Sequence, residues 1–280
     1  MLCLIVRWNY NLGGLMMSLV DLSCTYFEND FLTLYNDKAE DVLEYMVSNN
    51  YKFDTIITSP PYNFNKLYNK YSDNLEYMDY LMFIDNIVSL ISKVMDDSSS
   101  FFLNIGHKPS FYLFPYDIVN ICRKYFILQN NFIWTKALTV NDDSYGHFKP
   151  INSNRYVNDL WENVFHFTLN GDVEIDRLSN GVSYKDKTNI KRWSSKKDNR
   201  CKGNVWYIPY NTVNSKKNHP AQFPVELPSN CLRLMKEPKL VLDPFIGVGN
   251  TAIACKDLGI KCVGIDIDNT YLDECIKIFV

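Results

Sequence analysis

The chain has 280 residues, of which 46% are hydrophobic and 22% are charged. These values lie near the averages of globular proteins, so disordered, fibrous and coiled-coil classes are excluded, and the length suits one large domain or one domain with an insert. The net charge of −3 would argue against a polyanionic partner if it were evenly spread, but residues 171–218 carry 11 Lys and Arg against 5 Asp and Glu. This basic segment has a net charge of +6 and the remaining chain one of −9.

The N-terminal residues and the cysteines indicate the compartment. Arg7 interrupts the apolar run of residues 1–6 before it reaches the length of a signal peptide, and no stretch approaches the roughly 20 apolar residues of a membrane helix. The eight cysteines include no C-x-x-C pair and no zinc spacing with histidine. We therefore expect a cytoplasmic protein with reduced thiols, no metal site and no membrane association.

Strands and helices alternate along the chain. Short β-branched or aromatic runs predict strands, and apolar residues at helical spacing predict helices. The expected strands are 31–35, 53–57, 100–105, 132–134, 163–167, 240–242 and 262–265. The expected helices are 39–47, 80–95, 227–235, 251–258 and 271–279. This alternation predicts an α/β fold with a doubly wound, mostly parallel sheet that is covered on both faces.

A proline-rich turn follows the expected strand at 53–57. It reads Ser59-Pro60-Pro61-Tyr62. Because proline lacks the amide hydrogen that a sheet needs, two prolines end the strand there. We therefore expect this turn at the carboxyl edge of the sheet.

A glycine loop near the C-terminus joins a strand to a helix. It contains Asp243, Phe245, Gly247 and Gly249, and Asp266 ends the next strand. Such a turn lets the backbone approach a ligand, and an acid at the end of the next strand can bind the hydroxyls of a ribose. The same spacing also fits the dinucleotide fingerprint of an NAD-dependent oxidoreductase.

Asp243 favours a different cofactor. A carboxylate before the glycines would repel a pyrophosphate but would attract an ammonium group. S-adenosylmethionine carries such a group and has no phosphate. Phe245 is placed to form a wall beside the adenosine.

The two motifs together resemble the DNA amino-methyltransferases, in which S/D-P-P-Y/F is the catalytic turn and D-P-F-x-G-x-G-x-T the cofactor loop. His219-Pro220-Ala221-Gln222-Phe223-Pro224 begins a third match, to the H-P-A-x-F-P-x-x-L-P element of that family. The motif order is that of the family's beta class, and the resemblance extends from Phe31 to the C-terminus. A weaker match near Asp37 has Asn36 in place of the usual Gly, so a cofactor role for Asp37 is only suggested.

The resemblance implies a Rossmann-like methyltransferase fold with permuted motif order and an inserted target-recognition segment. We expect an N-terminal extension at 1–30, a catalytic half at 31–170, the insert at 171–218 and a cofactor half at 219–280. The implied catalytic residues are Ser59, Pro60, Pro61 and Tyr62. The implied residues for S-adenosylmethionine are Asp243, Phe245, Gly247, Gly249, Thr251, Asp266, His219 and Phe223.

The chemistry explains these residue types. An exocyclic amine of cytosine or adenine is a weak nucleophile, because its lone pair is conjugated into the ring. The Ser59 hydroxyl and the Pro60 carbonyl can accept its N–H hydrogens and free that lone pair for attack on a methyl group. Tyr62 offers a flat face for a base that has been flipped out of the duplex. In the resembling family Ser at the first position goes mostly with cytosine N4 and Asp with adenine N6, so Ser59 favours cytosine.

The basic segment is the expected reader of DNA, since lysine and arginine bind phosphates while arginine and asparagine read base edges. Arg192, Asn199 and Arg200 are candidate base readers. The candidate DNA-binding residues are Lys191, Arg192, Lys196, Lys197, Arg200 and Lys202. Trp134 and the pair Trp161-Glu162 are expected in the core or the pocket wall. Further candidates for contacts with the backbone of the flipped base are Lys136, Asn154, Arg155 and Asn158.

The leading hypothesis is an S-adenosylmethionine-dependent methyltransferase that acts on cytosine N4 in duplex DNA, as the modification enzyme of a restriction–modification system. Adenine N6 methylation is the alternative within the class. An NAD-dependent oxidoreductase and a non-catalytic DNA-binding protein are further alternatives, and an RNA target stays open. A cognate endonuclease for the same site is a possible partner, and the sequence leaves open whether the protein is a monomer or a homodimer.

Overall fold

The computed structural model describes residues 4–11, 14–21, 25–66, 69–108, 110–148, 150–192, 197–209 and 222–280. The strands are β1 (Leu4–Asn11), β2 (Gly14–Asp21), β3 (Phe27–Glu28), β4 (Leu32–Tyr35), β5 (Thr55–Thr58), β6 (Ser100–Ile105), β7 (Ile127–Thr135), β8 (Ala137–Val140), β9 (Asp143–Gly146), β10 (Trp161–Thr168), β11 (Val205–Tyr207), β12 (Leu240–Asp243) and β13 (Lys261–Ile265). The helices are α1 (Ala39–Ser48), α2 (Tyr77–Lys93), α3 (Phe114–Cys122), α4 (Thr188–Arg192), α5 (Glu226–Leu234), α6 (Asn250–Leu258) and α7 (Asn269–Ile276).

Nine strands form the main sheet, in the order β11-β7-β10-β6-β5-β12-β13-β4-β3. The five central strands from β6 to β4 run parallel to one another. β10 runs antiparallel to both β6 and β7, and β3 antiparallel to β4. The expected mostly parallel α/β sheet is therefore confirmed.

Two hydrophobic cores lie on the two faces of the sheet. One packs α1, α2 and α3 against it, and the other packs α5, α6 and α7. Every residue of β5 is buried, with Ile56 in the first core and Ile57 in the second. A strand covered on both faces has this continuous apolar character, which is why the sequence pattern identified it.

All seven expected strands and all five expected helices are present, with ends that differ by a few residues. The helix expected at 80–95 begins at Tyr77 and ends at Lys93, for example. Helix α3 was not expected, and neither was the hairpin of β8 and β9. The hairpin turns at Asn141 and Asp142, which both have positive φ, as the twist of a two-residue hairpin loop requires.

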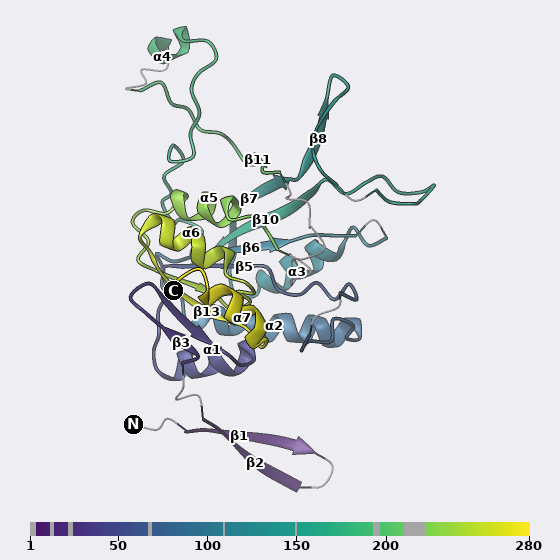
Figure 1. The fold of residues 1–280 in the computed structure, drawn as a ribbon, viewed down its shortest axis with the longest axis vertical. Helices are drawn as coiled ribbons and strands as arrows, with labels where there is room; N and C mark the ends of the chain where they lie inside the picture. Colours follow the sequence, from purple (N-terminus) through teal and green to yellow (C-terminus); the bar gives the residue numbers. More distant parts are fainter. Residues whose placement is uncertain are drawn as a thin grey trace.

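The basic segment is not wholly separate from the sheet. Its residues 205–207 form β11, the edge strand beside β7, and Trp206 is buried with its ring stacked on Phe132 at 4.3 Å between centroids. Trp206 is thus a core residue, which the polar composition around it concealed. Helix α4 belongs to the same segment and lies away from the sheet (Figure 1).

Two further expectations concern the rest of the described chain. The six described cysteines are free thiols, and five of them are buried. Among the described residues, no helix combines the length and the apolar character that crossing a bilayer demands.

β1 and β2 pair only with each other, in an antiparallel two-stranded sheet outside the main one.

A substitution of Leu242 on β12 tests whether this side chain belongs to the hydrophobic core. Its side chain is fully buried at the centre of the sheet, so Leu242→Ala should lower the free energy of unfolding by about 2–5 kcal/mol through lost burial and a residual cavity. Urea denaturation followed by circular dichroism measures this. Met82→Ala on α2, where the side chain is 61% exposed, is the control and should change it by less than about 0.5 kcal/mol.

Candidate active site

One large cavity, of about 1050 Å³, opens at the carboxyl ends of the central strands. The turn after β5, the loop after β12 and the loop after β13 all line it, together with residues that follow β4 and β6. Parallel strands place their carboxyl ends along one edge, so segments far apart in the chain meet there. Pockets that hold one drug-sized ligand have about 300–1,000 Å³, so this cavity lies at the upper end of that range.

The proline turn lines the cavity. Ser59, Pro60, Pro61 and Tyr62 all contribute to its wall. Ser59 Oγ and Tyr62 Oη lie 2.8 Å apart, and the Pro61 carbonyl accepts a hydrogen bond from the buried Tyr80 at 3.0 Å. The turn is therefore held from inside the protein at the cavity wall.

The next loop is held by one buried carboxylate. Asp73 is 3% exposed and accepts hydrogen bonds from the backbone amides of Asn63, Phe64 and Lys66 at 2.8–3.0 Å. Because Asn63 follows Tyr62 directly, this carboxylate also fixes the end of the proline turn. Nothing in the residue types around Asp73 distinguished it in the sequence.

A polar cluster stands behind Tyr62, and its hydrogen bonds were not predicted from the sequence. Glu162 accepts hydrogen bonds from Tyr62 at 3.2 Å, from Asn104 at 3.0 Å and from Lys136 at 2.5 Å. Glu162 and Lys136 line the cavity, and so does Trp134, whose ring lies under the Lys136 ammonium at 5.1 Å. Trp134 and Glu162 thus lie in the pocket wall, as expected, whereas Asn104 was not singled out.

The glycine loop lines the same cavity with Phe245 and Gly247. The Gly247 amide donates to Asp266 Oδ2 at 2.9 Å, and the Asp268 amide donates to Asp266 Oδ1 at 2.8 Å. Gly249 has φ +91°, and a Cβ there would lie 2.3 Å from the Cys275 sulfur, so only glycine fits. The loop and the acid are therefore one hydrogen-bonded unit.

Asp243 and Thr251 lie beneath the loop and do not line the cavity. Asp243 is 1% exposed, and it accepts hydrogen bonds from Thr58 Oγ1 at 2.9 Å, Thr251 Oγ1 at 2.6 Å and the Phe245 amide at 3.1 Å. Its carboxylate thus has internal partners, which the sequence argument for attraction of a cofactor ammonium did not anticipate. Gly249 also lies outside the cavity lining.

Burial dominates the acids of this site. It raises the pKa of Asp243 to about 6, against the lowering effect of its hydrogen bonds to Thr251, Phe245 and Thr58. It also raises the pKa of Asp266 to about 6, although the Asp268 and Gly247 amides lower it. Both acids are therefore harder to ionise than ordinary aspartates.

Of the remaining expected cofactor residues, Phe223 lines the cavity, and His219 lies outside the described residues. Asp37 caps the Lys38 amide at 2.8 Å and does not line the cavity, whereas Asn36 donates to the Asp266 carbonyl at 2.9 Å. Asn36 thus joins the cofactor loop through its side chain.

The expected DNA-binding residues lie on the basic segment. Lys191 and Arg192 are exposed on α4, Lys197 and Arg200 are exposed after it, Lys202 is half-buried, and Lys196 lies outside the described residues. None of those described lines the cavity. Asn199 donates to the Leu178 carbonyl at 3.0 Å, so its amide is engaged within the segment. Asn158 accepts from the Ile151 amide at 2.8 Å and thereby closes the loop before β10.

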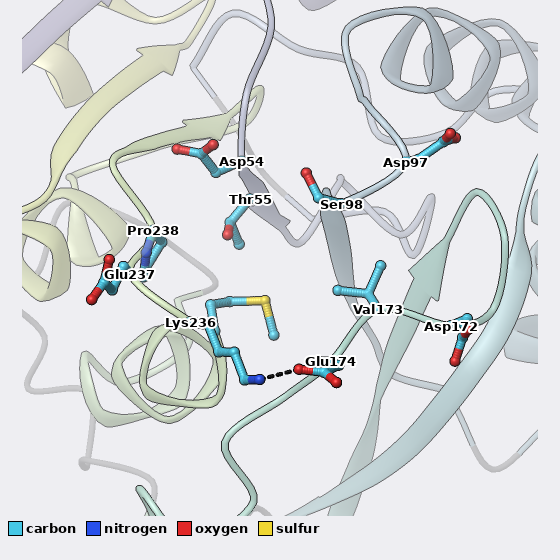
Figure 2. A pocket seen from close by; sticks show the side chains of 11 residues that line it. Asp54, Thr55, Asp97, Ser98, Asp172, Val173, Glu174, Lys236, Glu237 and Pro238 are labelled. Atoms are coloured by element: carbon cyan, nitrogen blue, oxygen red, sulfur yellow. Dashed lines mark hydrogen bonds and ion pairs between the residues drawn. The ribbon is translucent and has the colours of Figure 1, made fainter.

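A second cavity of about 430 Å³ lies at the opposite edge of the sheet, at the amino ends of β5, β6 and β12. Its wall is largely acidic, with Asp54, Asp97, Asp172, Glu174 and Glu237, and Lys236 forms an ion pair with Glu174 (Figure 2). The proline turn and the glycine loop do not contribute to it. The candidate active site is therefore the larger cavity.

The sequence profile of a family described as DNA methylase, of the N6/N4 methyltransferases, matches residues 53–277. The chain is 27% identical over 271 residues to the type II methyltransferase M.ScaI of Streptomyces caespitosus, and this match covers 90% of this chain and 82% of that protein. It is 25% identical over 235 residues to the DNA adenine methyltransferase YhdJ of Escherichia coli (strain K12), covering 78% and 73% of the two chains.

A solved structure extends this similarity to the fold. The PvuII DNA methyltransferase, described as cytosine-N4-specific, matches with a TM-score of 0.64 and 19% sequence identity. The match covers 90% of this chain and 87% of that one. The two chains therefore share a fold.

The two raised pKa values predict how stability depends on pH. A carboxyl group whose pKa is higher in the folded chain binds a proton more tightly there, so its stabilising contribution is present at low pH and is lost as the pH rises through the folded pKa. The free energy of unfolding should therefore fall between about pH 4 and pH 6. For Asp243, with a pKa of about 6 against an ordinary 3.8, the loss is on the order of 3 kcal/mol.

Urea denaturation at a series of pH values measures this loss, and Asp243→Asn should flatten the curve over the same interval. A variant curve parallel to that of the unsubstituted protein would show that Asp243 does not titrate there.

Proposed function

Since the chain belongs to the DNA methylase family of N6/N4 methyltransferases, we propose that it transfers a methyl group from S-adenosylmethionine to an exocyclic amine of a base in duplex DNA. The observation that carries this proposal is one cavity that both the proline turn and the glycine loop line. A group held by one loop can therefore meet a group held by the other.

The residues at the glycine loop fit the proposed cofactor. Asp266 keeps acceptor capacity for ribose hydroxyls, because each of its oxygens receives only one backbone amide. Phe245 presents an aromatic ring to the cavity, and Gly247 lets the ligand approach the backbone. When bound, S-adenosylmethionine supplies an electrophilic methyl group on a sulfonium sulfur.

The residues at the proline turn fit a flipped base. Ser59 Oγ and the Pro60 carbonyl are the proposed acceptors for the amine hydrogens, and Tyr62 the proposed stacking surface. By orienting the amine and accepting its hydrogens, these groups would favour attack by the nitrogen lone pair on the sulfonium methyl. The N–C bond would form as the methyl–sulfur bond breaks, S-adenosylhomocysteine would leave with the electron pair of that bond, and one N–H proton would pass to water. Positioning and electrostatics suffice for such a transfer.

We favour cytosine N4 as the acceptor, because Ser59 stands at the first position of the turn. Adenine N6 is the alternative. Both chemistries occur among similar proteins, since YhdJ is named an adenine methyltransferase and the PvuII enzyme a cytosine-N4-specific one. The neutral Ser59 hydroxyl is chemically able to accept a hydrogen bond from either base.

The basic segment is the proposed DNA reader, and its charge supports that role. Its exposed lysines and arginines stand apart from an otherwise acidic chain. Because M.ScaI is named a type II methyltransferase, we propose that this protein protects the recognition site of a cognate restriction endonuclease. The alternative of an NAD-dependent oxidoreductase rests on glycine spacing alone. The intact catalytic turn argues against the alternative of a non-catalytic DNA-binding protein.

Ser59→Ala and Tyr62→Ala should each lower methyl transfer at least about 100-fold, because each removes a group that orients the amine. Tritiated methyl transfer to plasmid DNA measures the rate, and circular dichroism checks the fold. Digestion of the DNA to nucleosides then identifies the product as N4-methylcytosine or N6-methyladenine. Full activity in both variants would refute the catalytic assignment. Detection of N6-methyladenine would show that the target base is adenine and not cytosine.

Replacing Arg192 and Arg200 together by alanine should weaken DNA binding and lower its salt dependence. Each lost phosphate contact should reduce the slope of log K against log salt concentration by about 0.9. Fluorescence anisotropy with a labelled duplex at several salt concentrations measures this slope. Arg123→Ala, an exposed position after α3, is the matched control, and an unchanged slope in the double variant would contradict the assignment of the basic segment.

A further inference from the structure

Glu162 lies within a chain of hydrogen bonds that ends at Ser59. Glu162 Oε1 accepts from Lys136 Nζ at 2.5 Å, and Oε2 accepts from Asn104 Nδ2 at 3.0 Å and from Tyr62 Oη at 3.2 Å. Tyr62 Oη in turn lies 2.8 Å from Ser59 Oγ. These hydrogen bonds thus connect the catalytic turn to a charged pair, which consists of Glu162 on β10 and Lys136 directly after β7.

The count of hydrogens gives this chain one direction. Tyr62 Oη carries a single hydrogen, and three of its four oxygen neighbours can only accept: the Glu162 carboxylate, the Asn104 carbonyl at 3.3 Å and the Asn104 side-chain oxygen at 3.4 Å. The orientation of the Asn104 amide follows from its Nδ2, which contacts two acceptors, Glu162 and the Asn163 carbonyl. The hydrogen bond between the two hydroxyls is therefore favoured in the direction from Ser59 to Tyr62, beside the Gly106 amide, which also donates to Tyr62.

The charge states agree with this direction. Burial alone would raise the pKa of Glu162, but Lys136, Asn104 and Tyr62 together hold that pKa below its ordinary value. Burial, and then the charge of Glu162, raise the pKa of Tyr62 well above its ordinary value. At neutral pH Glu162 is an ionised acceptor and Tyr62 a neutral donor, and a hydrogen bond to a charged acceptor is the stronger kind.

The packing leaves these groups little freedom. A Cβ added at Gly106 would lie 3.0 Å from Glu162 Cδ and 3.1 Å from Tyr62 Cε2. The glutamate and the tyrosine ring therefore occupy the space beside this glycine, at the end of β6. The side chains of Glu162 and Lys136 are only 14% and 21% exposed.

We propose that Glu162 is a positioning residue that turns the Ser59 hydrogen away from the cavity, so that Ser59 presents only acceptor lone pairs to the target base. The proposal rests on the proposed function and adds a selectivity to it. An exocyclic amine donates to such an oxygen, whereas a carbonyl oxygen at the same ring position, as in uracil or hypoxanthine, has no hydrogen to donate. A site with an unpaired buried acceptor discriminates strongly against such an analogue.

The experiment combines protein variants with base analogues. The recognition site is first identified by sequencing plasmid DNA from cells that express the protein. Two duplexes then carry at the target position either the natural base or its carbonyl counterpart, uracil for cytosine or hypoxanthine for adenine. Fluorescence anisotropy in the presence of S-adenosylhomocysteine, which cannot donate a methyl group, gives the dissociation constant of each protein for each duplex.

Tyr62→Phe removes the acceptor of the Ser59 hydrogen, and Glu162→Gln removes the charge that orients Tyr62. Both should lower the ratio of the carbonyl-base to the amine-base dissociation constant by at least about fivefold relative to the unsubstituted protein, with affinity for S-adenosylhomocysteine unchanged. Comparing the same two duplexes in every protein cancels the effect of the altered base pair on flipping.

Glu174→Gln is the matched control, since it breaks another glutamate–lysine pair far from Tyr62. An unchanged ratio in Tyr62→Phe and Glu162→Gln, with methyl transfer present in the unsubstituted protein, would overturn the role of Glu162 and leave the proposed function standing. No methyl transfer to any DNA by the unsubstituted protein would overturn both. If Glu162→Gln fails to fold, Tyr62→Phe, which keeps the packed ring, decides alone.

Discussion

The carboxylate of Asp243 joins the proline turn to the glycine loop. It accepts hydrogen bonds from Thr58 at the end of β5 and from Thr251 at the start of α6. Thr58 precedes the proline turn directly, and Asp243 precedes the glycine loop, although 185 positions separate them. Because an unpartnered carboxylate is costly to bury, these hydroxyls and the Phe245 amide are what allow Asp243 to hold the two loops at a fixed spacing.

The antiparallel strand β10 gives the site its third component. Because it runs opposite to β6, its first residues lie at the edge where the parallel strands end, and Glu162 therefore faces Tyr62. A parallel strand in the same place would present its last residues there instead. The proline turn is thus supported by β5, which ends directly before Ser59, and by β10, which carries the charged Glu162 behind it.

The distribution of charge agrees with this arrangement. Asp266 lines the active-site cavity and Asp243 lies beneath it, and burial raises the pKa of both acids. Five acidic residues line the second cavity. The lysines and arginines are concentrated on a segment that leaves the sheet after β10 and returns to it as β11. A polyanion is therefore attracted mainly to one part of the molecule, and that attraction is sensitive to salt.

The sequence by itself determined the central sheet, its covering helices and the two loops at its edge. Buried strands such as β5 are apolar throughout, and the proline turn and the glycine loop have local backbone requirements that only particular residues meet. It did not determine which polar residues stand behind those loops. Asn104, Lys136 and Glu162 come from different elements and meet through strand pairing, which a single sequence does not specify. The same applies to Asp243, whose residue type fitted a cofactor contact. Only the tertiary structure gave its carboxylate internal partners, because the threonines that bind it are brought together by folding.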